Sequence, residues 1–168
     1  MLLYVLVGYV LLCIESPLLS SFHVRMYAPD PALAVVVYAA AAMDFLPGIF
    51  TAFILGLLKD GFSGGVPLGL HVETFVAVFL AGAALSRRLD YRGAVLMALT
   101  VVVASLASSF LFFILSAIFD RDFEEFDLIF RLAIPQALVS APMGPIVGGI
   151  LSFIDNRVLQ VEREGLFR

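Results

Sequence analysis

The sequence is poor in charge, cysteine and histidine, and each scarcity excludes a class of protein. Only 14% of the 168 residues are charged and 62% are hydrophobic, whereas a soluble domain has about 25% charged residues. The single cysteine, Cys13, excludes an internal disulfide framework. Two histidines, His23 and His71, are too few for a metal site built from several His or Cys ligands. The net charge of −4 argues against a nucleic-acid partner, which would require a basic surface.

Apolar residues are abundant, and they occur in long blocks with the charges collected between them. The mean hydropathy is +1.06. This pattern is typical of a polytopic membrane protein. We therefore predict an all-α fold in which the whole chain, 1–168, forms one integral membrane domain, a bundle of six transmembrane helices embedded in the lipid bilayer. The predicted spans are 2–20, 31–43, 47–60, 70–86, 93–119 and 130–154.

The segment 31–58 allows two interpretations. It is either one long, kinked span, which gives five spans in total, or a tight helical hairpin that turns at 43–48, which gives six. The hairpin is favoured because Pro47 and Gly48 interrupt a helix and Asp44 would be costly in the middle of a bilayer. Each arm is then short for a hydrocarbon core of about 30 Å.

The distribution of arginine predicts the orientation in the membrane. Loops rich in Lys and Arg stay in the cytoplasm, and arginines gather in the loop 87–92 and in the tail 155–168. The acid-rich segment 120–127 then faces outward. Six spans place both termini in the cytoplasm, whereas five would place the N-terminus outside.

The most distinctive stretch, 57–71, lies between two apolar segments and holds four glycines and one proline. Such residues shape a defined turn, which we expect on the outer side between the third and fourth spans. Asp60 and His71 within it could form a proton or cation site. Alternatively, Asp60 caps the turn by accepting backbone N–H bonds and His71 bonds to it. The second interpretation is favoured, because these groups, like Glu15 and Glu73, lie near span ends where water is available.

Small residues four positions apart predict close contacts between helices. Gly144 and Gly148 have this spacing in the last span, and Ser105 and Ser109 have it in the fifth. The neighbour could belong to the same chain or to a partner. Two prolines within 142–145 are expected to bend the last helix.

The sequence specifies no catalytic, cofactor or metal site. Ser63, Asp60 and His71 are close in sequence, but no second base or orienting carboxylate accompanies them. The glycines lack the Gly-Lys-Ser/Thr ending of a phosphate-binding loop. We therefore expect a protein that is not an enzyme.

A set of residues around the second, third and fourth spans follows a recognisable order: Pro29, Asp30, Gly56, Asp60, Gly61, Ser63, Gly64, Gly65, Pro67, Leu68, Gly69 and His71. In this order, and in its size and hydropathy, the chain resembles the MreD family of bacterial rod shape-determining membrane proteins. The specific motif is confined to 56–71. One departure is Asp44, because the corresponding turn is often basic in relatives.

The resemblance implies a non-enzymatic scaffold subunit of the bacterial cell-elongation machinery in the inner (cytoplasmic) membrane, without cofactors. Its expected partner is an MreC-like periplasmic scaffold protein, and indirectly the MreB filament, the RodA glycosyltransferase and its transpeptidase. The family is also similar in architecture to the substrate-binding subunits of energy-coupling vitamin transporters, although fold does not carry function. The alternative function is therefore a small-solute (vitamin-like) binding subunit of a transporter, which would require an outer pocket lined by convergent polar groups.

Overall fold

The computed structural model describes residues 1–22, 29–62, 69–86, 93–119 and 126–165. Within these residues the chain is all-helical, as predicted, and contains no strand. The helices are α1 (Leu2–Phe22), α2 (Pro31–Ala42), α3 (Phe45–Phe62), α4 (Leu70–Ser86), α5 (Ala94–Phe119), α6 (Phe126–Ser140) and α7 (Met143–Gly165).

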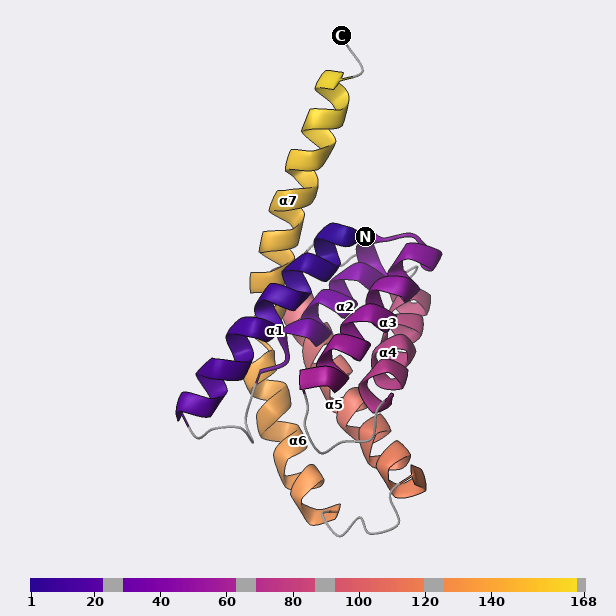
Figure 1. Ribbon diagram of the computed structural model, residues 1–168, viewed down its shortest axis with the longest axis vertical. Coiled ribbons are helices and arrows are strands. Elements are labelled where there is room, and N and C mark those ends of the chain that lie inside the picture. The colour runs from indigo at the N-terminus through magenta and orange to yellow at the C-terminus, as the bar shows by residue number, and fades with distance from the viewer. Residues whose placement is uncertain (23–28, 63–68, 87–92, 120–125, 166–168) are drawn as a thin grey trace.

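The helices α1 to α6 run up and down the bundle in turn, and the N-terminus and the end of α7 lie toward the same end of it (Figure 1). The last predicted span, 130–154, comprises parts of two helices, α6 and α7. The chain turns at Ala141 and Pro142 and then continues in the same direction as α7, which extends to Gly165. Pro142 has no N–H to donate and disfavours the helical conformation in the residue before it. The predicted bend in this part of the chain is thus present.

The predicted hairpin between the second and third helices is also present, although its turn is shorter than expected. Only Met43 and Asp44 separate α2 from α3. Pro47 lies in the first turn of α3, where an N–H has no partner within the helix. Gly48 packs against the ring of Phe79 from α4, and a side chain at this position would overlap that ring.

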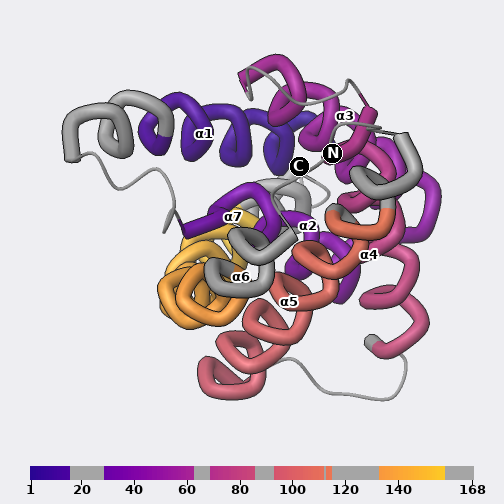
Figure 2. Tube along the Cα trace, turned by 90° about the horizontal axis from the view of Figure 1, so that it is seen from below, coloured from indigo at the N-terminus to yellow at the C-terminus, as the bar shows by residue number. Residues whose placement is uncertain are grey.

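Helix α2 occupies the centre of the bundle (Figure 2). It contacts α1, α3, α4, α5 and α7, and nine of its 12 residues are buried. Most of these residues are alanine and valine, which let neighbouring helices approach closely. A helix that is apolar on every side requires such complete enclosure. Phe75 and Phe79 of α4 fill much of the remaining core.

Large apolar side chains also lie on the outside of the bundle. On α5, Val95, Leu99, Val103, Leu106 and Phe110 are all exposed, and their spacing of three or four residues places them on one face of the helix. Similar exposed faces occur on α1, α3 and α7. Exposed apolar patches of this extent indicate contact with lipid or with other proteins.

Among the described residues, three helical segments are long and apolar enough to cross a membrane: Phe45–Phe62, Ala94–Leu111 and Ala133–Arg157. Three further apolar segments are shorter: Leu2–Glu15, Pro31–Ala42 and Leu70–Leu85.

A tyrosine–aspartate cluster joins three helices at the end of the bundle that carries the N-terminus. The Tyr4 hydroxyl on α1 donates a hydrogen bond of 2.6 Å to Oδ2 of Asp155 on α7. The Tyr38 hydroxyl on α2 donates to the same oxygen over 3.3 Å. The two rings pack with their centroids 6.0 Å apart. No sequence pattern reveals this cluster, because its members are remote from one another along the chain.

We expect the substitution Tyr4→Phe to lower the free energy of unfolding by about 2 kcal/mol, a typical value for a hydrogen bond to a charged acceptor. Tyr38→Phe should cost less, since its bond is longer. Denaturant unfolding in detergent measures both effects. If the tyrosine–aspartate bond is their source, the cost of Tyr4→Phe shrinks in an Asp155→Asn background. An equal cost in both backgrounds would attribute the loss to packing instead.

Candidate functional site: an ionisable cluster and a polar cavity

Five ionisable side chains from four helices converge at the opposite end of the bundle. They come from α1, from the residue that caps α2, from the end of α3 and from the start of α4. We call this set the ionisable cluster; it consists of Glu15, Asp30, Lys59, Asp60 and His71.

Asp60 caps helix α4 from the end of helix α3. Its Oδ2 accepts the backbone N–H of Gly69 over 2.9 Å, and its Oδ1 accepts that of His71 over 3.1 Å. Oδ1 also lies 2.8 Å from Nδ1 of the His71 ring. Gly69 has a φ of +106°, a conformation that favours glycine. This is the capping arrangement predicted for Asp60, with one difference: Asp60 lies within α3 and is buried.

Asp30 caps helix α2 and ties it to two other helices. Its Oδ1 accepts the backbone N–H of Leu33 over 3.0 Å, which is the usual role of an aspartate before a helix that begins with proline. Its own N–H donates to Oγ of Ser140 on α6 over 3.1 Å. Its Oδ2 forms an ion pair with Lys59 of α3. The Lys59 ammonium also lies 5.3 Å from the centroid of the Phe75 ring.

Gly56 sets the closest approach between α3 and α4. A Cβ atom placed on this glycine would lie 2.5 Å from Cα of Val72 and 2.9 Å from its N. Both atoms belong to the backbone of α4 and cannot rotate away. The motif glycine of the third helix is therefore required by the packing of two helix backbones.

The remaining residues predicted for the motif are dispersed. Pro29 is half-buried beside Asp30, and Gly61 is exposed with open space where a Cβ would lie. Five others lie outside the described residues: Ser63, Gly64, Gly65, Pro67 and Leu68. No three His, Cys, Asp or Glu side chains within the described ranges are arranged to hold a metal ion.

The two acidic residues that the sequence placed near this end differ in environment. Glu73 is exposed on the first turn of α4. Glu15 lies close enough to Asp30 and Lys59 to interact electrostatically with both. Its Oε2 is buried and has no hydrogen-bond partner within the part of the chain that the structure describes.

The predicted contact glycines pack against other helices of the same chain. A Cβ atom on Gly144 would lie 3.0 Å from the carbonyl oxygen of Met97 on α5. Gly148 faces the side chain of the same methionine. These residues thus join α7 to α5 within the chain.

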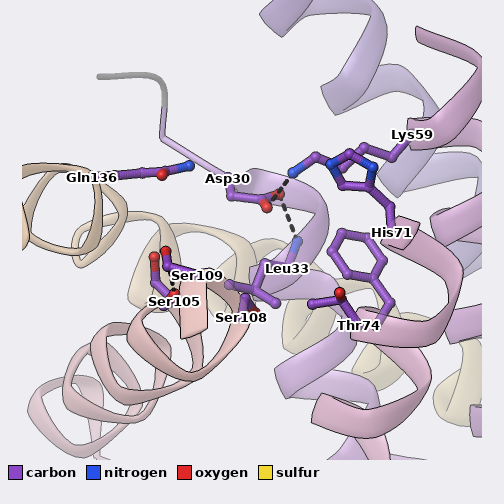
Figure 3. A pocket seen from close by; sticks show the side chains of 10 residues that line it. Asp30, Leu33, Lys59, His71, Thr74, Ser105, Ser108, Ser109 and Gln136 are labelled. Carbon is purple, nitrogen blue, oxygen red and sulfur yellow. Dashed lines mark hydrogen bonds and ion pairs between the residues drawn. The ribbon is translucent and has the colours of Figure 1, made fainter. Parts of the chain in front are cut away.

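A polar cavity of about 180 Å³ lies beside the ionisable cluster (Figure 3). Ser105 and Ser109, the other predicted contact pair, line it from α5 together with Ser108. Asp30 and Lys59 line it from the side of the ionisable cluster. No pattern in the sequence predicts a cavity here, because the residues that form it come from five separate segments of the chain.

The described residues thus define an all-helical protein with three segments able to cross a membrane and a set of charged caps that hold helix ends together. No protein-family model, no curated protein and no solved structure matches the chain.

Proposed function

We propose that the chain is an integral membrane protein with six passes, in which α6 and α7 together form the last one. The N-terminus and the end of α7 lie toward the same end of the bundle, which supports an even number of passes (Figure 1), and the arginine-rich loop 87–92 favours cytoplasmic termini. The exposed apolar faces of α1, α3 and α5 suit contact with lipid. The 12-residue α2 is short for a span, but the helices around it enclose it.

Within that membrane, the protein acts as a non-enzymatic scaffold subunit of the bacterial cell-elongation complex, as its resemblance to the MreD family implies. One observation carries this proposal: the polar groups of the motif are bonded to one another. Both carboxylate oxygens of Asp60 accept hydrogen bonds from the chain, and Asp30 is shared between Leu33 and Lys59. Carboxylates used in this way hold helices in place, whereas a catalytic nucleophile or base must be free to reach a substrate.

The proposed partners are an MreC-like periplasmic scaffold protein and, through it, the RodA glycosyltransferase and its transpeptidase; the MreB filament is the expected partner on the cytoplasmic side. Apolar helix faces such as Leu99, Val103 and Phe110 of α5 give a partner helix a surface to pack on. The work of the protein is then to bring membrane proteins together.

A pull-down from membranes of the native host tests the scaffold function. We expect the purified protein to carry a single-span periplasmic protein with a coiled-coil region, identified by mass spectrometry in a near-stoichiometric amount. Depletion of the chain should turn rod-shaped cells round, and the wild-type gene should restore the rod. Unchanged cell shape together with the absence of the MreC-like protein would reject the scaffold function.

The polar cavity favours a second function, that of a solute-binding subunit of a transporter. Convergent polar groups in a pocket are the feature that such a subunit requires. The volume of about 180 Å³ is small beside the roughly 300–1,000 Å³ of sites for drug-sized ligands, so the scaffold function ranks first. Retention of a vitamin-sized molecule and association with an ATPase module during purification would reverse that order.

A further inference from the structure

The polar cavity is lined by side chains whose hydrogen-bonding capacity the chain leaves unused. Ser105 is only 3% exposed, and its hydroxyl has no hydrogen-bond partner within the described residues. The carboxamide of Gln136 also has none there, and its side chain points toward Asp30 at the centre of Figure 3. Buried polar groups are almost always bonded. These two groups are therefore available to bond to an occupant of the cavity.

The other hydroxyls that line the cavity present mainly lone pairs to it. Ser108 donates its hydroxyl proton to the carbonyl oxygen of Ala104 over 2.8 Å, and Ser109 donates to that of Ser105 over 3.0 Å. Thr74 donates in the same way to Leu70 over 2.8 Å. A hydroxyl that has donated its only proton can still accept. The occupant must therefore donate several hydrogen bonds.

The two charged side chains that line the cavity, Lys59 and Asp30, neutralise each other. The Lys59 ammonium is paired with Asp30, and the ring of His71 is bonded to Asp60. A charged occupant would have to break one of these pairs to obtain a counter-ion, and burying an uncompensated charge is costly. The occupant is therefore uncharged.

We propose that this cavity binds a small uncharged group rich in hydroxyls. Hydroxyls can donate to the serine and threonine oxygens and accept from Gln136 and Ser105, while Leu33 and Phe75 supply an apolar wall for the carbon skeleton. The volume of about 180 Å³ corresponds to about six water molecules at roughly 30 Å³ each, which suits a polyol no larger than a monosaccharide. The group can belong to a free polyol or to the headgroup of a glycolipid.

Binding to the whole chain in phosphatidylcholine nanodiscs tests the proposal. Equilibrium dialysis measures radiolabelled glucose and myo-inositol, and native mass spectrometry measures glucosyl-diacylglycerol against plain diacylglycerol. Binding of a free polyol identifies a soluble ligand; binding of the glycolipid alone identifies a headgroup. Gluconate and glucosamine, which carry a charge on a similar skeleton, should bind at least tenfold more weakly than glucose if the ligand is free. Failure of every uncharged probe to bind overturns the proposal and leaves a water-filled cavity.

Two substitutions locate the binding. Ser105→Ala and Gln136→Leu each remove a group without a partner among the described residues and should weaken binding at least tenfold, at an unchanged unfolding temperature. Ser152→Ala is the matched control, because this serine lies on α7 and bonds to its own helix. Gln136, which is only partly buried, keeps the test available if Ser105→Ala fails to fold. Wild-type affinity in a folded variant overturns the proposal. The test is independent of the scaffold function, which the pull-down decides separately.

Discussion

Replacing Gly56 by alanine should lower the free energy of unfolding by about 3 kcal/mol, the upper part of the range for overpacking. Its new Cβ would lie 2.5 Å from Cα of Val72, a distance that no side-chain rotation can relieve. Helices α3 and α4 would have to separate, which would disturb the Asp60 cap between them. Gly56→Leu should leave no folded protein. Thermal unfolding in detergent and the yield of monodisperse protein measure these effects.

Gly149 offers a matched control in the same chain. It lies in helix α7, is exposed, and has no atom within 4 Å of the point where a Cβ would lie. Alanine there should leave stability unchanged or raise it by up to about 1 kcal/mol, because alanine favours a helix more than glycine does. An unfolding temperature for Gly56→Ala that equals that of Gly149→Ala would show that α3 and α4 can separate at no cost.

The apolar pattern was sufficient to predict the helices, because the length and polarity of each block depend on local sequence alone. The first five predicted spans agree with α1–α5 to within a few residues. Two details differ from the prediction, and both involve proline. Pro47, which is predicted to interrupt a helix, lies in the first turn of α3, and Pro142 separates α6 from α7 within a span that is predicted as one bent helix. Proline is tolerated in a first turn and disruptive further along, so its effect depends on where the helix starts.

Whether a bond within the candidate site could be predicted from the sequence depends on how many residues separate its two partners. The Asp60 cap could be predicted, since Asp60 and His71 lie 11 residues apart on either side of one turn. The pairing of Lys59 with Asp30 spans 29 residues and depends on how α2 packs against α3. The cavity depends in addition on α5 and α6, whose serines and glutamine could equally have faced lipid or a partner. Only the assembled bundle decides such contacts.

The last prediction concerns Asp60, whose removal should cost about as much stability as Gly56→Ala. Asp60→Ala removes the acceptor of two backbone N–H groups and the carboxylate beside Nδ1 of His71. At about 1–3 kcal/mol for each buried donor without a partner, we expect a loss of about 3 kcal/mol or more. Asp60→Asn keeps one oxygen and should retain a large part of the stability. Amide hydrogen exchange at Gly69 and His71 should accelerate in the order wild type, Asn, Ala.

This series separates a structural cap from a proton or cation site, the other interpretation of the same residues. A cap requires acceptor oxygens, so the effect of Asp60→Asn should lie between wild type and Asp60→Ala. A proton site requires a group that ionises, so Asp60→Asn would damage the protein as much as Asp60→Ala does. Glu73→Gln is the control, because Glu73 is exposed on the first turn of α4 and its charge is worth only about 0.3–1 kcal/mol there. If exchange at Gly69 and His71 is unaffected by Asp60→Ala, the cap does not hold α4 in place, and the support that it gives to the scaffold function is lost.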